Sequence, residues 1–478
     1  MQVNVTNGTL TQIQETLSPA SGYELPSTIS VTGATSVYNS TTGALTLTSI
    51  GSSVSITASG DSASPTPTET KNIWANTNQI AKAFWGSSKI KIYLGSTLVY
   101  GTSEEPEPQP VAEPYLTFSS PSSFTLNIID NTKYWDGTLY YSTDTTNWSE
   151  WGGTTTLNSS SSGTTKYLYL RGSNNTIITD SSASSTKAKW VLTGTNISCI
   201  GNIENLLDYQ TVANGNHPTM ANYCYRNMFY GCTALTTPPS LPATTLADYC
   251  YYGMFQNCTS LTTAPSLPAT TLANYCYRYM FYGCTNLTIA PSLPATTLAD
   301  YCYYYMFQNC TSLTTTPSLP ATTLAERCYQ GMFYGCTSLT TAPSLLATTL
   351  FDYCYSYMFF NCSSLTTAPA LPATTLAYNC YYNMFRACSS LTTPAIMASG
   401  TTQATSAKQC CGEMYFGCTA LNIYTSSSGH TPFYKAITYS TKSSATNYRS
   451  SYQMFYYCKI NGTQSETDYL TAGTQYYY

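Results

Sequence analysis

The sequence predicts a multidomain protein, with small all-β modules at the N-terminus and a long α/β solenoid after them. The solenoid is predicted by cysteines that recur every 26 residues from Cys224 to Cys380, and by a second cysteine eight residues after each of them. The all-β modules are predicted by residues 1–60 and 115–195, where β-branched and aromatic residues alternate with small polar ones. A single 26-residue unit is too small to bury its own apolar side chains, so the units are expected to stack.

Two linkers divide the N-terminal part of the chain. Residues 61–70 are rich in Ser, Pro and Thr, and residues 104–114 are Pro-rich and acidic. Between them, "NIWANTNQIAKAFWG" predicts a helix and "KIKIYLGSTLVYG" a β-hairpin around Gly95 and Ser96. The expected boundaries are an immunoglobulin-like β-sandwich that serves as an anchor (1–60), a linker (61–70), a helix-plus-hairpin module (71–103), a second linker (104–114), a β domain (115–195), an N-terminal repeat cap (196–220), the solenoid (221–458) and a C-terminal cap (459–478).

Each repeat predicts one helix and one short strand. On a helical wheel, Cys250, Met254 and Cys258 fall on one apolar side, and Thr245 is a suitable N-cap. The residue before the second cysteine is usually Gly or Asn, which accept left-handed geometry and suit a helix end. A helix is therefore expected from about Leu246 to Gln256, with a strand at "SLTTAP". The predicted structural core residues are Cys250, Met254, Phe255, Cys258 and Leu261.

The repeat motif resembles a known family. The cysteine series continues at Cys410 and Cys418, and then at Ser450 and Cys458, which gives about nine units. The pattern "MFxxCxxLxxxPxLPxTxL" is similar to BspA-like leucine-rich repeats over roughly residues 220–458, half of the chain. That resemblance implies a leucine-rich-repeat solenoid with a binding role. The N-terminal modules, with "KIKIYLGSTLVY", resemble modules of phage virion appendages.

The 19 cysteines have three competing interpretations. Both positions in each repeat lie in the apolar stripe, which favours a ladder of buried free thiols. Disulfides are the second interpretation, although the number is odd and the N-terminus shows no export signal. Zinc is the third, but C-x7-C spacing and only two histidines, His217 and His430, disfavour it. No metal or other cofactor is expected.

The sequence offers little catalytic chemistry. His217 and His430 lie in predicted loops, and no motif fixes a partner for either. Glu204 and Asp208 are interpreted as capping or surface residues. Acidic residues recur near the starts of the predicted helices, where the helix dipole is expected to stabilise them. They are Asp248, Asp300, Glu326 and Asp352. We therefore expect a protein that is not an enzyme.

A binding face is predicted where the repeats differ from one another. Two positions on the outer face of the predicted helix vary, and Tyr and Arg, which are common in binding hot spots, recur there. The candidate ligand-binding residues are Arg226, Tyr230, Tyr252, Gln256, Arg278, Tyr282, Tyr304, Gln308, Tyr334, Tyr382 and Arg386. Three alternatives remain open: a tyrosine layer that only covers the surface, the threonine-rich strand face, and the insertion at 422–450.

These features predict a phage virion fibre or appendage that folds in the host cytoplasm and is extracellular after assembly. Its N-terminal domain would contact other virion proteins, and its repeats would bind a host-surface glycan or protein, in a possible trimer. A net charge of −4 with 8% charged residues gives no nucleic-acid footprint, and no apolar stretch predicts membrane insertion. The alternatives are a bacterial cell-surface adhesin with BspA-like repeats and a purely structural capsid or tail decoration. A polysaccharide hydrolase would need a carboxylate pair that the sequence does not show.

Overall fold

The chain divides into two compact units, Met1–Gln109 and Pro110–Tyr478, which are described separately. The computed structural model describes strand backbone within residues 2–98 and the chain at 114–130, 132–179, 189–398, 402–403, 409–435, 454–464 and 475–478. Side chains are described from residue 114 onward, except at 402–403, 433–435 and 475.

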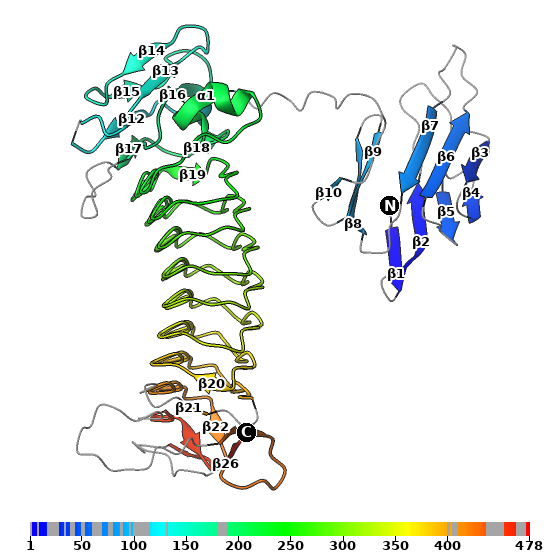
Figure 1. Cartoon of the computed structure of the whole chain (residues 1–478), viewed down its shortest axis with the longest axis vertical. Helices are drawn as coiled ribbons and strands as arrows, with labels where there is room; N and C mark the ends of the chain where they lie inside the picture. The colour runs from blue at the N-terminus through cyan, green and yellow to red at the C-terminus, as the bar shows by residue number, and fades with distance from the viewer. Residues whose placement is uncertain are drawn as a thin grey trace. The chain divides into compact units, whose positions relative to one another are not determined.

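The described strands of the first unit form three antiparallel sheets (Figure 1). The first sheet has the order β1 (Gln2–Thr6), β2 (Thr9–Thr16), β5 (Ala44–Thr48) and β4 (Thr35–Tyr38). The second has the order β3 (Thr28–Thr32), β6 (Ser53–Ser59) and β7 (Glu69–Trp74). The third has the order β10 (Thr97–Leu98), β9 (Lys89–Leu94) and β8 (Ile80–Gly86). The immunoglobulin-like assignment stays a prediction.

The hairpin around Gly95 and Ser96 is present, because β9 pairs with β10 on either side of these two residues. The helix predicted in "NIWANTNQIAKAFWG" is wrong. β7 and β8 occupy this segment, and they pair with β6 and β9 respectively. Strand pairing satisfies the backbone of both pieces, and this outweighs the weak helix preference of a short segment.

The second unit begins with a β domain that continues into the repeats. One sheet has the order β14 (Ser149–Trp151), β13 (Thr138–Ser142), β16 (Lys166–Ser173), β11 (Leu116–Ser120), β18 (Ile197–Ile200) and β19 (Leu235–Thr237). The other has the order β15 (Leu157–Asn158), β12 (Thr125–Ile128) and β17 (Trp190–Thr193). Since β18 pairs with β11 on one side and with β19 on the other, the first repeat extends the sheet of the domain before it.

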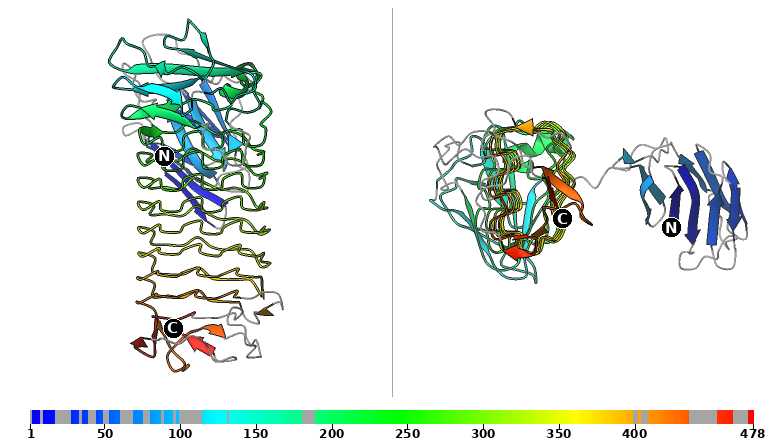
Figure 2. Two further views of the ribbon diagram at one scale, coloured as in Figure 1. Left: turned by 90° about the vertical axis from the view of Figure 1, so that its left-hand side faces the viewer. Right: turned by 90° about the horizontal axis from the view of Figure 1, so that it is seen from below.

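The repeats form coils that stack on one another and lie over one another when viewed from below (Figures 1 and 2). The helix predicted at Leu246–Gln256 is wrong, because residues 248–257 form a run of consecutive turns. Every second amide donates within its own turn, as from Tyr252 N to Tyr249 O at 3.1 Å. The amides between them donate to the next coil, as from Gly253 N to Arg278 O at 2.8 Å. Outside α1 (Asn205–Ala213), the described residues contain no α-helix.

The turns repeat every four residues, and this explains the error. Cys250, Met254 and Cys258 are buried, as expected, but their spacing of four fits both a helix and this ribbon of turns. Positive φ angles recur at the same spacing, at Tyr249 (58°), Gly253 (58°) and Asn257 (59°). The position before the second cysteine is therefore left-handed, as predicted, but it does not end a helix.

Identical side chains stack in columns through the core. Phe255 and Phe281 have ring centroids 5.7 Å apart, and Phe281 and Phe307 have centroids 5.5 Å apart. A parallel column of buried tyrosines includes Tyr251 and Tyr277, 5.8 Å apart. The Phe column continues through rings that follow the repeat methionines, namely Phe229, Phe255, Phe281, Phe307, Phe333, Phe359, Phe385, Tyr415 and Phe455. A count of nine units stays a prediction, and Ser450 lies outside the described residues.

The second cysteine of each repeat ties one coil to the previous one. Cys284 Sγ donates to Phe255 O at 3.0 Å, and Cys310 Sγ donates to Phe281 O at 3.0 Å. Leu261 is also buried, but the strand predicted around it is reduced to single parallel bridges such as Thr263 to Ile289. Apolar burial and these repeated hydrogen bonds hold the stack together.

Short strands follow at the C-terminal end. They are β20 (Thr375–Leu376) with β21 (Thr402–Gln403), β22 (Asn422–Ile423) with β24 (Lys459–Ile460) and β25 (Thr463–Gln464), and β23 (Pro432–Lys435) with β26 (Gln475–Tyr477). Residues 436–450 of the predicted binding insertion lie outside the described residues. Within the described ranges, the structure has no helix with the length and apolar character that a membrane span requires.

Candidate functional site

A column of tyrosines lies on the surface of the first repeats. Its members precede the first cysteine of each repeat: Tyr223, Tyr249, Tyr275 and Tyr301. Successive ring centroids are 4.7, 4.4 and 4.6 Å apart, and all four side chains are partly exposed. We call these residues the outer tyrosine column. Because their faces cover one another, they present ring edges and hydroxyl groups to solvent.

A second column alternates arginine and tyrosine. It consists of Arg226, Tyr252, Arg278 and Tyr304, two positions after each first cysteine. The Arg226 guanidinium carbon lies 5.0 Å from the Tyr252 ring centroid, and that of Arg278 lies 4.4 Å from the Tyr304 centroid. These are cation–π distances. Together with the outer tyrosine column, these residues make up what we call the Tyr–Arg face.

Arg278 is the centre of this face. Its guanidinium carbon lies 4.4 to 5.6 Å from the centroids of five rings, those of Tyr252, Tyr275, Tyr279, Tyr301 and Tyr304. Nη2 donates to the Tyr279 hydroxyl at 3.4 Å, whereas the buried Nε has no hydrogen-bond partner. Burial raises the pKa of Tyr249 and of Tyr304 to about 12, so these phenols are protonated donors at neutral pH.

The structure separates the predicted binding residues into groups. Arg226 is buried, and the other ten are partly exposed, on the ribbon of turns rather than on a helix. Arg226, Tyr252, Arg278 and Tyr304 lie together. Elsewhere, Tyr334 stacks on Phe360 with centroids 4.4 Å apart. Tyr230 lies beside Lys189, and both Tyr382 and Arg386 contact Glu413. The remaining predicted residues are Gln256, Tyr282 and Gln308.

Sequence reasoning missed the outer tyrosine column and Tyr279. The signal was the recurrence of tyrosine immediately before the first cysteine in four successive repeats. Even on the assumed helix, this position lies three residues before Tyr252 and seven before Gln256, and so on the same face as the other varying positions. In the turn ribbon, it lies beside them.

Comparison with known proteins supports the repeat type. Residues 208–340 and 279–414 match the model of the BspA type leucine rich repeat region. These repeats are BspA-like leucine-rich repeats. No curated protein and no solved structure matches the chain significantly.

The acidic residues of the BspA-like repeats have a different role from the one predicted. Asp248 Oδ1 accepts the backbone N–H of Asn274 at 2.9 Å, and Asp300 Oδ1 accepts that of Glu326 at 3.0 Å. Asp352 Oδ1 accepts the N–H of Tyr378 in the same way. The helix-dipole explanation is wrong, because no helix starts here. These carboxylates instead link neighbouring coils, and Asp248 and Asp300 are next in sequence to Tyr249 and Tyr301 of the outer tyrosine column.

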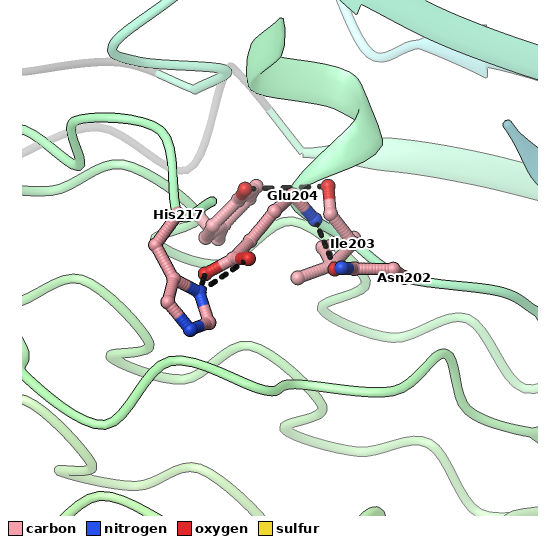
Figure 3. A network of polar contacts seen from close by, with 5 residues as sticks. Asn202, Ile203, Glu204 and His217 are labelled. Carbon is pink, nitrogen blue, oxygen red and sulfur yellow. Dashed lines mark hydrogen bonds and ion pairs between the residues drawn. The ribbon is translucent and has the colours of Figure 1, made fainter. Parts of the chain in front are cut away.

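The cap before the BspA-like repeats holds a buried carboxylate next to a histidine (Figure 3). Glu204 is only 2% exposed, and its Oε2 lies 2.8 Å from His217 Nδ1. Sequence analysis interpreted Glu204 as capping or surface, which is wrong: it is buried and makes no side-chain cap. His217 was expected to have no partner fixed by a motif, and the fold supplies one from 13 residues away.

Burial raises the pKa of Glu204 above its ordinary value of 4.5, although His217 opposes the shift. A raised pKa in the folded state means that the native protein binds more protons than the unfolded chain above pH 4.5. We therefore expect the free energy of unfolding to decrease as pH rises from about 4.5 through the raised pKa. Chemical denaturation at several pH values measures this.

Two variants check that prediction. Glu204→Gln should flatten the pH dependence in this window, and His217→Ala should make the decrease steeper, because the ionised carboxylate loses its partner. An unchanged pH profile in Glu204→Gln would contradict the assignment.

The cysteines of the chain are all buried free thiols. Burial raises the pKa of Cys276 and of Cys284 to about 12. A thiol held in its protonated form is a poor nucleophile and a poor metal ligand. Within the described ranges, no group of three His, Cys, Asp or Glu side chains is placed to hold a metal ion.

The strand face, the alternative binding surface, contains an open groove of about 470 Å³ between two coils. Its lining includes Thr341, Thr367 and Leu346, which is 49% exposed and replaces the proline of neighbouring repeats. The lining residues have no charged side chain. The groove therefore offers less chemical selectivity than the Tyr–Arg face.

Proposed function

We propose that this chain is a non-enzymatic binding protein, a cell-surface adhesin whose BspA-like repeats bind a surface glycan through the Tyr–Arg face. The observation behind this proposal is the cluster of Arg278 and five tyrosine rings on one side of the stack. Tyr and Arg provide contact area and hydrogen bonds at a small entropic cost.

The setting of the face also favours binding. Its tyrosines are held by stacking within each column and by the hydrogen bonds between coils, so a ligand meets a preformed surface. Phenol hydroxyls and the guanidinium donate hydrogen bonds, which suits the hydroxyl and ring oxygens of a glycan. The phage-appendage interpretation has no support from the comparisons and stays a prediction.

The test is a double variant, Tyr252→Ala with Tyr304→Ala, in the full chain. A cut at residue 195 is avoided because it would separate β18 from the domain with which it forms a sheet. Removing two central side chains is expected to weaken binding to glycan-bearing cells by about tenfold or more. Flow cytometry with labelled protein measures the change.

Tyr382→Ala is the matched control, because Tyr382 occupies the same repeat position outside the cluster. Its binding should stay within about twofold of the wild type, since a contact outside the binding site contributes little. Circular dichroism would establish that all variants are folded. If the folded double variant binds as well as the wild type, the Tyr–Arg face only covers the solenoid.

A further inference from the structure

The arginines of the repeats differ in whether the protein neutralises them. Arg327 Nε lies 3.1 Å from Glu326 Oε1, and Arg386 pairs with Glu413. Arg278 has no carboxylate partner among the described residues; its neighbours are uncharged tyrosines. Among the described residues, carboxylates therefore pair with Arg327 and Arg386, and none pairs with the arginine at the centre of the Tyr–Arg face.

The donors of Arg278 are largely unused. A guanidinium has five N–H donors, and the one hydrogen bond that the Arg278 side chain makes within the described part of the chain is from Nη2 to Tyr279 Oη at 3.4 Å. Ring contacts with tyrosine partly compensate a cation but do not neutralise it. A partly buried, unpaired guanidinium is therefore suited to accept an anion from outside.

A carboxylate fits this arrangement. Its planar geometry matches the fork of a guanidinium, and its oxygens can also accept hydrogen bonds from neighbouring phenols. The phenols that surround Arg278 include Tyr304, which is a protonated donor at neutral pH and whose pKa burial raises further, to about 12.

The surroundings favour a polymer with repeated hydroxyl groups. Tyr252 lies on one side of Arg278 and Tyr304 on the other, and the outer tyrosine column runs alongside. The same polar chemistry therefore continues in both directions from the charge. A saccharide chain that carries a carboxylate can use the arginine at one sugar and the phenol hydroxyls at the adjoining sugars.

We propose that Arg278 binds the carboxylate of a hexuronic acid in an acidic polysaccharide. This inference rests on the proposed function, for which it names the class of glycan. It predicts that the protein distinguishes a uronic acid from its uncharged ester.

The experiment compares two forms of one polymer, using the full chain and biolayer interferometry. The probes are polygalacturonate and fully methyl-esterified polygalacturonate, which share a sugar backbone but differ in charge. The wild type should bind the acid form about tenfold or more tightly than the ester, as expected for a charge-assisted, bidentate contact. Equal binding of the two forms by the wild type would overturn the inference.

Matched variants assign the effect to one side chain. Arg278→Gln should abolish the preference for the acid, and Arg278→Lys should retain part of it, because lysine keeps the charge but loses the fork. Arg327→Gln, in which Glu326 loses its partner, should leave the preference unchanged. A preference that survives in folded Arg278→Gln would also overturn the inference.

Two further measurements test whether the site recognises sugar and whether the proposed function depends on Arg278. A poly-glutamate peptide that binds as tightly as polygalacturonate would show that the site takes carboxylates without recognising sugar, which contradicts the saccharide assignment. If Arg278→Gln binds glycan-bearing cells normally while the Tyr252→Ala, Tyr304→Ala variant does not, the inference fails and the proposed function stands.

Discussion

Replacing Phe307 with alanine is expected to lower the free energy of unfolding by about 3–5 kcal/mol, the usual cost of truncating a buried phenylalanine. Phe307 is fully buried, and its ring centroid lies 5.5 Å from that of Phe281 and 5.7 Å from that of Phe333. The truncation removes one member from the middle of the Phe column. The two neighbouring rings each lose a stacking contact, and the coils on both sides enclose the cavity.

Urea denaturation followed by circular dichroism measures this loss. Phe307→Leu is the control, because it keeps most of the apolar volume and should cost about 1–1.5 kcal/mol. If Phe307→Ala lowers the free energy of unfolding by less than about 1 kcal/mol, the Phe column is not the main source of stability in this part of the stack.

Replacing Gly331 with alanine is expected to cost about 2–4 kcal/mol, from a left-handed backbone and an overpacked contact. Gly331 has a φ of 62°, and an added Cβ would overlap the ring of Tyr305 in the preceding coil. The same position holds tyrosine in Tyr279, Tyr305 and Tyr357, all with positive φ. The ring of Tyr305 therefore occupies space that is available only because glycine follows it one coil later.

Two companion variants separate the causes of this loss. Gly215→Ala adds a Cβ at a φ of 77° with nothing within 4 Å, so it reports the backbone cost alone. Tyr305→Ala in the Gly331→Ala background should recover part of the stability, because it removes the overlapping ring. Thermal denaturation of the four proteins gives the comparison. Equal losses in Gly215→Ala and Gly331→Ala would show that ring overlap contributes nothing.

The repeat architecture could be predicted from sequence, but its local conformation could not. The 26-residue spacing of cysteines predicts stacked units, and this prediction does not depend on the backbone conformation within each unit. The spacing of Cys250, Met254 and Cys258 is shared by a helix and by the ribbon of turns. What distinguishes them is that Gly253 N and Phe255 N donate to the next coil, a bond that exists only after stacking.

The residues of the candidate site were predicted in part, but the charge pairing around them was not. Variation between repeats pointed to Tyr252, Arg278 and Tyr304, which do lie together. Whether an arginine has a counter-ion depends on where each carboxylate is directed. Asp300 forms no ion pair with Arg278, and its Oδ1 accepts the backbone N–H of Glu326. The contact between Glu204 and His217 could not be predicted from the sequence either, because it depends on how the loop that carries His217 folds.

The hydrogen bonds between coils also bear on how such a gene can change. Tyr251 N reaches Cys276 O, Tyr277 N reaches Cys302 O and Tyr303 N reaches Cys328 O, always with the same offset in sequence. Within the 26-residue units, each coil therefore presents to its neighbour the same backbone donors and acceptors as the next coil does. Duplication or loss of the coding sequence for one such unit preserves the backbone hydrogen bonds between the coils on either side, so evolution can adjust the length of the array in whole units.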